Sequence, residues 1–516
     1  MQRAHADIPG AFRAAAARWP TATAIALPDA EWSFREVDQL SDRLAGALAV
    51  QGLREGDRVG LYCPNSPEFA IVYLGIVKAG ATVVPVNLLL NPKEVAFILS
   101  DAGVSALFFH AALTEQVQAF RHCLSASTWT VSIGAGDEAA HLDRLLGQGQ
   151  EPPAPALDPA QDLAVILYTS GTTGRPKGAM LTHANLTANA LSVAEGLELK
   201  AGEDRLLVVL PLFHAFAATV GMLTPLLHGM SFVPVPRFEP ALVNDCIAAT
   251  GATVFLGVPS MYALFSRLEP DKLVHWRSVR VCVSGGAALP QAVRQAFEER
   301  FGVPVLEGDG PTECSPVTCV NPRQGVRKAG SVGLPVPNVE MCILDDLGRP
   351  VPDGEMGEVC VRGPNVMKGY WNLPEETAQS FTGDWFRTGD LGYRDADGYF
   401  FLVDRKKDLI IVNGMNVYPR MIEEVLYRHP KIAEAAVVGE YHRLHGEIPV
   451  AHVVPIAGAQ LDAAEVRAWC RQHLGRHEVP RRTLLRESLP KNAAGKILKR
   501  ELRRDGELER GVASRD

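Results

Sequence analysis

The residues with the strongest chemical content stand in one short segment, LYTSGTTGRPKG, at positions 167–178. It combines four glycine or proline residues, four serine or threonine residues and two basic residues, directly after an apolar run. Glycines allow the backbone to approach a ligand closely, while hydroxyls and backbone N–H groups can surround phosphate oxygens. The segment is not a Walker A loop, because Pro176, Lys177 and Gly178 stand where that motif needs Gly-Lys-Ser or Gly-Lys-Thr. Its composition therefore predicts either a polyphosphate-binding loop or an exposed turn.

Further motifs follow this segment along the chain: PLFH at 211–214, SGGAALP at 284–290, GPTE at 310–313, WFRTGD at 385–390, DRKKDLIIVNG at 404–414 and PKNAAGK at 490–496. With YTSGTTGRPKG at 168–178, this ordered set resembles the signature motifs of the acyl-adenylate-forming superfamily. That superfamily includes acyl-CoA synthetases, nonribosomal-peptide adenylation domains and beetle luciferases, and the chain is most similar to a fatty acyl-CoA synthetase. The resemblance spans nearly the whole chain, and several long motifs in one order are far more specific than any one of them.

The resemblance implies a reaction in which a carboxylate attacks the α-phosphate of ATP. Two anions then meet, so negative charge must be neutralised as pyrophosphate leaves. Thr312 and Glu313 are expected beside the α-phosphate and Mg²⁺, and a hard, oxygen-preferring ion suits the Glu313 carboxylate. Asp390 and Arg405 match the positions that hold the ribose hydroxyls. The residues expected to hold the phosphates are Thr169, Ser170, Gly171, Thr172, Thr173, Gly174 and Lys177.

Further roles follow from the same resemblance. Lys496 matches the C-terminal lysine that reaches the carboxylate and the phosphate during adenylation. His214 is expected near the acyl carboxylate and the wall of the acyl pocket. The aromatic residue that commonly stacks on adenine is replaced by Asp309, so ring stacking is in doubt at this position, where a backbone or polar contact could serve instead. The expected backbone shelf for adenine consists of Gly285, Gly286 and Ala287.

The same active site has to serve a second reaction, in which a thiol attacks the acyl carbonyl. Lys496 must leave before that thiol can approach, and the resemblance implies rotation of the whole C-terminal domain about a short linker. The pivot in the family lies two residues beyond the ribose-binding arginine, which places it at Lys407. Gly414 is expected to line the CoA tunnel after the rotation, because a residue without a Cβ lets the backbone approach pantetheine.

The segment after PLFH indicates the class of acid. Members of the family that load amino acids usually carry an aspartate there, but HAFAATVGMLTPLL at 214–227 offers only apolar or small groups until His228. An apolar monocarboxylate is therefore expected, and CoA is the expected acceptor because only a short tail follows Lys496. These points predict an ATP-dependent, AMP-forming acyl-CoA synthetase for a medium- or long-chain fatty acid.

Alternatives to this prediction stay open. An aromatic-acid CoA ligase of the coumarate or benzoate type shares every motif. A fatty acyl-AMP ligase would form the adenylate without using CoA, and a luciferase-like oxygenase would emit light with an adenylated luciferin. A catalytically inactive nucleotide-binding protein is disfavoured, because Lys496, Glu313 and Asp390 are all present.

The elements that must position these motifs follow an α/β pattern. Apolar runs such as LAVILYT and TVFLGVP alternate with helix-like segments such as QAVRQAFEERF, which predicts layers with largely parallel sheets. From about residue 330, short strands and turns predict a β-rich subdomain. We therefore expect a large N-terminal domain of layered α/β subdomains over 1–404, a hinge over 405–408 and a small mobile α+β domain over 409–516.

Two apolar stretches are long enough to raise the question of a membrane span. Residues 206–236 contain no Asp, Glu, Lys or Arg, but several prolines interrupt them. This stretch predicts a buried strand, a loop, a buried helix and another strand. Phe69 to Leu90 is interrupted by Lys78 and predicts a helix that leads into a buried strand. No transmembrane segment is therefore expected.

Composition narrows the partners and the compartment. The formal net charge of -8 comes from 59 acidic and 51 basic residues without a long block of one sign, so nucleic acid is not an expected partner. Nine cysteines form no CxxC pair, and no secretory signal is expected at the N-terminus, which together indicate reduced thiols in the cytoplasm. Peripheral contact with a membrane and the choice between monomer and homodimer stay open.

Overall fold

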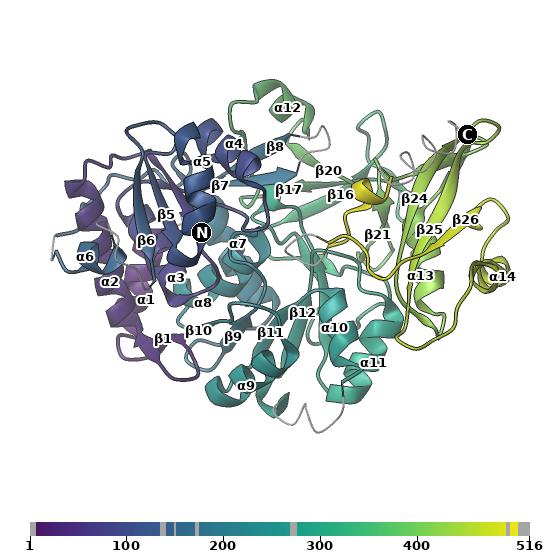
Figure 1. Ribbon diagram of the computed structural model, residues 1–516, viewed down its shortest axis with the longest axis horizontal. Coiled ribbons are helices and arrows are strands. Elements are labelled where there is room, and N and C mark those ends of the chain that lie inside the picture. Colours follow the sequence, from purple (N-terminus) through teal and green to yellow (C-terminus); the bar gives the residue numbers. More distant parts are fainter. Residues whose placement is uncertain are drawn as a thin grey trace.

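The computed structural model describes residues 7–134, 141–148, 151–170, 175–268, 276–491 and 496–503. They form a mixed α/β architecture with a large N-terminal domain and a smaller C-terminal domain beside it (Figure 1), which confirms the predicted fold class.

The largest sheet carries most of the motif residues. Its central strands run parallel from β1 through β10, β9, β11 and β12 to β13, with antiparallel strands at both edges. In spatial order the strands are β15 (Leu334–Pro335), β14 (Cys319–Val320), β13 (Val305–Asp309), β12 (Val281–Ser284), β11 (Val254–Gly257), β9 (Arg205–Val208), β10 (Ser231–Pro234), β1 (Thr23–Ala26) and β2 (Glu31–Ser33).

A second sheet presents the phosphate motif on an antiparallel edge. Its strands in spatial order are β18 (Gly369–Tyr370), β8 (Pro176–Thr182), β7 (Leu163–Ser170), β4 (Thr82–Pro85), β3 (Arg58–Tyr62), β5 (Ala106–His110) and β6 (Trp129–Ile133). The strands from β7 to β6 are parallel, while β8 and β18 are antiparallel additions.

The β-rich subdomain and the C-terminal domain each contain one smaller sheet. The subdomain sheet is antiparallel and consists of β16 (Glu340–Leu344), β17 (Gly357–Arg362), β20 (Trp385–Arg394), β19 (Phe381–Thr382) and β21 (Phe400–Arg405). The C-terminal sheet consists of β23 (Met415–Val417), β22 (Ile410–Val412), β25 (Gly446–Pro455), β24 (Ile432–His442) and β26 (Arg482–Leu485). Only a turn at 406–408 and one further residue separate β21 from β22.

Helices connect and cover these sheets. In the N-terminal domain they are α1 (Ile8–Arg18), α2 (Phe34–Val50), α3 (Pro67–Lys78), α4 (Pro92–Ala102), α5 (Thr114–Phe120), α6 (Leu142–Leu146), α7 (His183–Gly196), α8 (Thr224–Leu227), α9 (Pro240–Thr250), α10 (Pro259–Phe265), α11 (Gln291–Phe301) and α12 (Pro374–Gln379). The C-terminal domain adds α13 (Pro419–Tyr427) and α14 (Ala463–His473). A π helix over Phe216–Leu223 precedes α8 directly.

Helix α7 begins immediately after β8 because a capping box stops the strand there. The Thr182 hydroxyl accepts from the Asn185 N–H at 3.2 Å, and the Asn185 side-chain oxygen accepts from the Thr182 N–H at 2.9 Å. The chain therefore turns from the phosphate motif into a helix that packs against the π helix.

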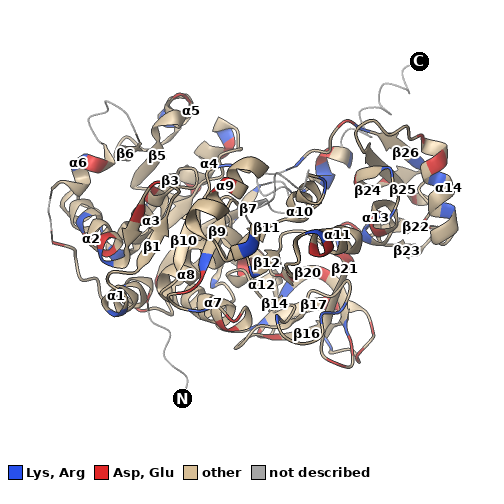
Figure 2. Cartoon of the chain, turned by 90° about the horizontal axis from the view of Figure 1, so that it is seen from below, with Lys and Arg blue, Asp and Glu red and all other residues tan. Residues whose placement is uncertain are grey.

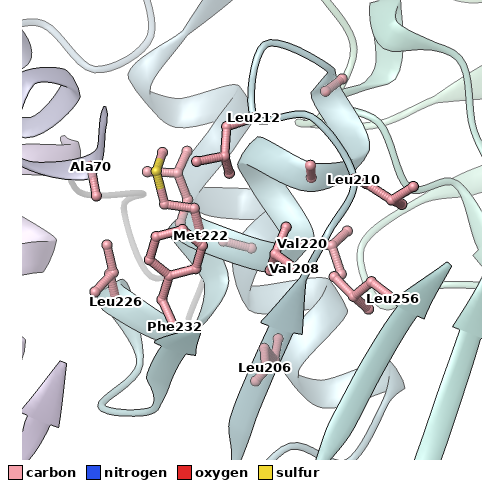
Figure 3. Close-up of a cluster of buried hydrophobic side chains, with 14 of the residues drawn as sticks. Ala70, Leu206, Val208, Leu210, Leu212, Val220, Met222, Leu226, Phe232 and Leu256 are labelled. Atoms are coloured by element: carbon pink, nitrogen blue, oxygen red, sulfur yellow. The ribbon is translucent and has the colours of Figure 1, made fainter. Parts of the chain in front are cut away.

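The charge-free stretch 206–236 is a core segment, as predicted. It forms β9, a loop, the π helix with α8, and β10. Figure 3 shows Val220 and Met222 of the π helix among Val208, Phe232 and other apolar side chains of neighbouring strands. A Cβ at Gly221 would lie 2.5 Å from a methyl group of Val208, so glycine lets the π helix approach the sheet. None of the helices in the described ranges combines the length and hydropathy of a membrane span.

Charged residues of both signs are interspersed over the elements seen in Figure 2. This distribution agrees with the absence of single-sign blocks in the sequence. All nine cysteines are free thiols, and most of them are buried. They act as small apolar side chains rather than as a disulfide framework.

Candidate active site

The topology of the largest sheet brings three motifs to one edge. Strands β9, β11, β12 and β13 are adjacent and parallel, so their carboxyl ends lie together. His214 follows β9, the segment 285–287 follows β12, and the segment 310–313 follows β13. The register pairs Ser284 with Glu307, which sets the last two segments level with each other. Ligands of parallel α/β sheets bind at this edge.

The phosphate motif lies on the β7–β8 hairpin. Thr169 pairs with Lys177 and Ser170 pairs with Pro176, so the strands meet just below the tip. The tip residues Gly171, Thr172, Thr173 and Gly174 and the Ser170 side chain lie outside the described residues. The structure therefore describes both sides of the predicted phosphate loop and not its end.

Glu313 and Lys177 meet at a tyrosine that sequence reasoning missed. The Tyr370 hydroxyl donates to Glu313 Oε1 at 2.8 Å. Lys177 Nζ lies 5.3 Å from the centre of the same ring, within the range of a cation–π contact. In the sequence, Tyr370 gives no signal beyond an aromatic pair with Trp371, which is typical of ordinary strands.

The donor set around Glu313 fits a magnesium ion shared with a polyphosphate. Tyr370 occupies one carboxylate oxygen, and within the described residues the other oxygen has no hydrogen bond or ion pair. The described part of the chain contains no group of three or more His, Cys, Asp or Glu side chains that could hold a metal alone. Mg²⁺ is commonly held by one or two carboxylates together with substrate phosphates, so one carboxylate is a suitable protein contribution.

The predicted ribose-binding residues form a cross-strand ion pair. Asp390 on β20 and Arg405 on β21 are register partners, and Arg405 Nε lies 2.9 Å from Asp390 Oδ1. The Asp390 side chain is 11% exposed, whereas Arg405 is 41% exposed. A buried acceptor beside an accessible donor suits a ligand with vicinal hydroxyls, one accepting and one donating.

Lys496 lies among the charged groups of this region although it belongs to the C-terminal domain. Lys496 keeps an exposed surface, and its ammonium interacts with the charges of Arg405, Asp390 and Asp309. Loss of hydration, together with the positive charge of Arg405, lowers the pKa of Lys496 to about 8, against the opposing effect of Asp390 and Asp309. The orientation of the two domains in this structure therefore places Lys496 at the N-terminal site.

The same surroundings shift the pKa values of His214 and Asp309 in opposite directions. Burial beside the positive charge of Lys496 lowers the pKa of His214 to about 4, so this imidazole is neutral near pH 7. Burial, with the Asp390 carboxylate nearby, raises the pKa of Asp309 to about 6. Arg405 and Lys496 limit that rise. Asp309 therefore stands in a cluster of charges, in addition to its expected place at adenine.

An apolar pocket opens beside these groups and has about 80 Å³ of open space. His214, Asp309 and Thr312 border it on the side of the charged cluster. The remaining walls come from α7, the π helix and segments at the ends of β9 and of β11 to β15, and include Val193, Leu197, Leu210, Ala215, Phe216, Ala217, Val220, Val258, Val283, Pro316, Val317, Val320 and Val336.

The glycines of the predicted adenine shelf line the same pocket. Gly285 is buried, and a Cβ there would lie 3.2 Å from the ring of Phe216. Gly286 has a φ of +76°, a conformation that favours glycine. Ala287 follows on the exposed side. The shelf is thus a backbone turn next to Asp309 that runs from the buried Gly285 to the exposed Gly286 and Ala287.

The hinge candidates lie apart from the pocket. Lys407 is exposed in the turn between β21 and β22, where the Asp408 N–H donates to the Arg405 carbonyl at 2.9 Å. Gly414, with a φ of +80°, and Asn413, with a φ of +51°, form the tip of the β22–β23 hairpin. A Cβ at Gly414 would meet nothing within 4 Å, and Figure 2 shows β22 and β23 at the outer side of the smaller domain. Gly414 is therefore not part of the site in this orientation.

A second interdomain contact accompanies Lys496. Arg420, at the start of α13, donates from its guanidinium to the Leu402 carbonyl at 2.7 Å, and it lies 3.8 Å from Glu307 of β13. Its N–H donates to Asp404 at 2.9 Å. Sequence reasoning did not select Arg420 or Glu307, since neither stands at a residue singled out in the motifs.

Comparisons with known proteins agree with this geometry. Residues 12–371 match the AMP-binding enzyme family, and residues 421–496 match the AMP-binding enzyme C-terminal domain. A long-chain-fatty-acid–CoA ligase of Bacillus subtilis (strain 168) is 37% identical over 94% of this chain and 92% of its own length. A feruloyl-CoA synthase of Amycolatopsis sp is also 37% identical, over 94% of this chain and 96% of its own. The crystal structure of the anthranilate CoA ligase AuaEII in complex with anthranoyl-AMP superposes with a TM-score of 0.92 at 30% identity, covering 98% of each chain. The chain belongs to the AMP-binding enzyme family, and within it to the AMP-forming CoA ligases.

Proposed function

We propose that this enzyme activates a medium- or long-chain fatty acid, first as an acyl-adenylate and then as a CoA thioester. The observation that carries the substrate class is the apolar pocket beside His214. Of its lining residues in the described ranges, only His214 and Asp309 are ionisable, and both border the charged cluster. An acid with a second charged group would lose its hydration in this pocket without gaining a partner, whereas an alkyl tail would not.

In this proposal the charged cluster serves the adenylation step. Lys496 neutralises the charge that develops between the carboxylate and the α-phosphate, and neutral His214 lies beside the acid without adding charge. Asp390 and Arg405 hold the ribose, Thr312 contacts the α-phosphate, and Lys177 contacts the phosphates at the hairpin. Mg²⁺, held by Glu313, supplies positive charge to the phosphate oxygens when it is bound.

The transfer to CoA requires a second orientation of the C-terminal domain. We place the hinge at 405–408 with Lys407 as its pivot, between domains 1–404 and 409–516. The short turn between β21 and β22 supports this placement, because a few dihedral changes there would move the whole domain. Gly414, now at an exposed hairpin tip, would then reach the acyl pocket and admit pantetheine.

An aromatic-acid CoA ligase is the second candidate, and the size of the pocket favours it. About 80 Å³ is open as the structure stands, so a long alkyl chain requires the walls to move more than a compact ring does. The relatives do not separate the two candidates, because the names of two equally similar ones refer to a long-chain fatty acid and to a feruloyl group. A fatty acyl-AMP ligase stays a third alternative until thioester formation is measured.

A panel of acids separates these candidates. The wild-type enzyme is incubated with ATP, Mg²⁺ and one acid, with and without CoA, and both AMP and thioester are quantified. We expect CoA-dependent thioester formation to rise from butyrate to dodecanoate and to stay low with benzoate and ferulate. The opposite ranking would identify an aromatic-acid ligase, and acyl-AMP without thioester would identify an acyl-AMP ligase.

Substitution of a pocket residue tests whether this pocket holds the distal part of the acyl chain. Val336 is 3% exposed and lines the pocket near the end of α7. Val336→Phe should reduce kcat/KM for dodecanoate by about tenfold or more, since added volume excludes the distal chain. Butyrate serves as the internal control and should keep its rate. Equal losses for both acids would show that this pocket does not hold the distal part of the chain.

A further inference from the structure

Tyr370 contacts two predicted ATP-binding residues that come from different parts of the chain. Its hydroxyl donates to Glu313 Oε1 at 2.8 Å, and its ring lies beneath Lys177 Nζ at 5.3 Å. A carboxylate can only accept a hydrogen bond, so the Tyr370 phenol O–H is the donor of this bond. One side chain thus links the carboxylate to the phosphate hairpin.

The backbone around Tyr370 is fixed on both sides. Tyr370 pairs with Ala179 of β8, and the Trp371 N–H donates to the Gly178 carbonyl at 2.7 Å. The Tyr370 N–H donates to the Thr377 hydroxyl of α12 at 2.9 Å. These bonds fix the position of the Tyr370 ring beside β8, the second strand of the phosphate hairpin.

Glu313 is attached to the same segment through its own backbone. The Met367 N–H donates to the Glu313 carbonyl at 2.7 Å. Both the main chain and the side chain of Glu313 therefore take their position from residues 367–370. This arrangement restricts the rotamers of the carboxylate before any ligand arrives.

We infer that Tyr370 is a positioning residue for the metal-binding carboxylate: its hydroxyl holds one oxygen of Glu313 and leaves the other for the ion. The inference rests on the proposed role of Glu313 as the Mg²⁺ ligand. Carboxylates that ligate metals are commonly held by hydrogen bonds from neighbouring groups, and loss of such a neighbour typically lowers metal affinity about 10- to 100-fold. Tyr370→Phe should act in this way, because it removes the hydroxyl and keeps the ring beneath Lys177.

Metal binding can be measured without turnover. Mn²⁺ replaces Mg²⁺ as the probe, and free Mn²⁺ is followed by electron paramagnetic resonance during titration of the enzyme with a non-hydrolysable ATP analogue and no acid. The matched control is Tyr399→Phe in the β-rich subdomain. Tyr399 also lies beneath a lysine, with Lys328 Nζ at 4.7 Å, and its hydroxyl donates to the Val326 carbonyl at 2.5 Å.

Tyr370→Phe should weaken Mn²⁺ binding on the order of tenfold, while Tyr399→Phe should bind the ion as the wild type does. In a Glu313→Gln background, Tyr370→Phe should cause no further loss, because the two groups act as one unit. Affinity for the nucleotide analogue without metal should stay at the wild-type value, since the ring beneath Lys177 is kept. Wild-type Mn²⁺ affinity in Tyr370→Phe, or losses that multiply in the double variant, would overturn the inference.

The result of the Mn²⁺ titration can be distinguished from the result of the acid panel that tests the proposed function. If the wild type forms no thioester with any acid while Tyr370 and Glu313 remain coupled in Mn²⁺ binding, the substrate proposal fails and the inference stands. If thioester forms and Tyr370→Phe binds Mn²⁺ normally, the inference alone fails.

Discussion

Lys496→Ala removes a C-terminal side chain that this orientation places among Asp309, Asp390 and Arg405. With a pKa of about 8, Lys496 is mostly protonated near pH 7, so the variant deletes a positive charge. A unit charge about 4 Å from developing negative charge, at an effective dielectric of about 20, is worth about 4 kcal/mol. That energy corresponds to a rate factor of about a thousand. We therefore expect acyl-adenylate formation to fall by roughly that factor.

The second half-reaction should not need this charge. When acyl-AMP and CoA are supplied, Lys496→Ala should form thioester at the wild-type rate, because the C-terminal domain has by then moved Lys496 away. Rapid-quench measurement of each half-reaction separates the two effects. Lys491→Ala is the matched control, because Lys491 belongs to the same segment and pairs with Glu434 at 2.6 Å, outside the site. Equal loss of both half-reactions in Lys496→Ala would refute the assigned role.

The lowered pKa of Lys496 predicts the direction of a pH effect on adenylation. The ammonium is the active form and its pKa is lowered to about 8, so kcat/KM for adenylation should fall as pH rises through that value. Lys496→Arg, which keeps its charge, should not show this alkaline fall. Thioester formation from supplied acyl-AMP should not show it in the wild type either.

Two further substitutions address Asp309 and the hinge. Asp309→Tyr should keep activity and lower the KM for ATP, because a ring can stack on adenine and the repulsion from Asp390 disappears. The control Asp309→Asn separates the loss of charge from the gain of a ring. A collapse of activity in both variants would show that the Asp309 carboxylate has a specific task. Lys407→Pro should still release pyrophosphate in a single turnover but lose thioester formation severely, because proline fixes φ at about -65° and also restricts Lys406. Lys407→Ala is its control, and near wild-type thioester formation by Lys407→Pro would show that the pivot lies elsewhere.

Local sequence signals predicted the elements that position the site. The charge-free stretch 206–236 was expected to form a strand, a buried helix and a second strand, and Figure 3 shows its side chains packed in the core. Asp390 and Arg405 were assigned to one site through the resemblance of their motifs to the family, and β20 and β21 make them register partners. Both structures form within a short stretch of the chain or between two neighbouring strands.

Contacts between distant segments could not be predicted in the same way. Tyr370 reaches Glu313 only because β18 joins the edge of the second sheet, which no local pattern specifies. The charge cluster around Asp309 depends on the orientation of the C-terminal domain, which supplies Lys496 and Arg420. Gly414 shows the converse, since its motif predicts a place near CoA while this orientation leaves it at an exposed tip. The domain limits and the pivot stay predictions for the same reason.

The central claim, that the acid is activated through an adenylate, can be tested by following one oxygen atom. The acid is prepared with both carboxylate oxygens isotopically labelled and is converted by the wild-type enzyme with ATP and CoA, and the products are analysed by mass spectrometry. If the carboxylate attacks the α-phosphate, one labelled oxygen must remain on AMP after thioester formation, and pyrophosphate must carry none. Unlabelled AMP, or label in pyrophosphate or in phosphate, would contradict the account.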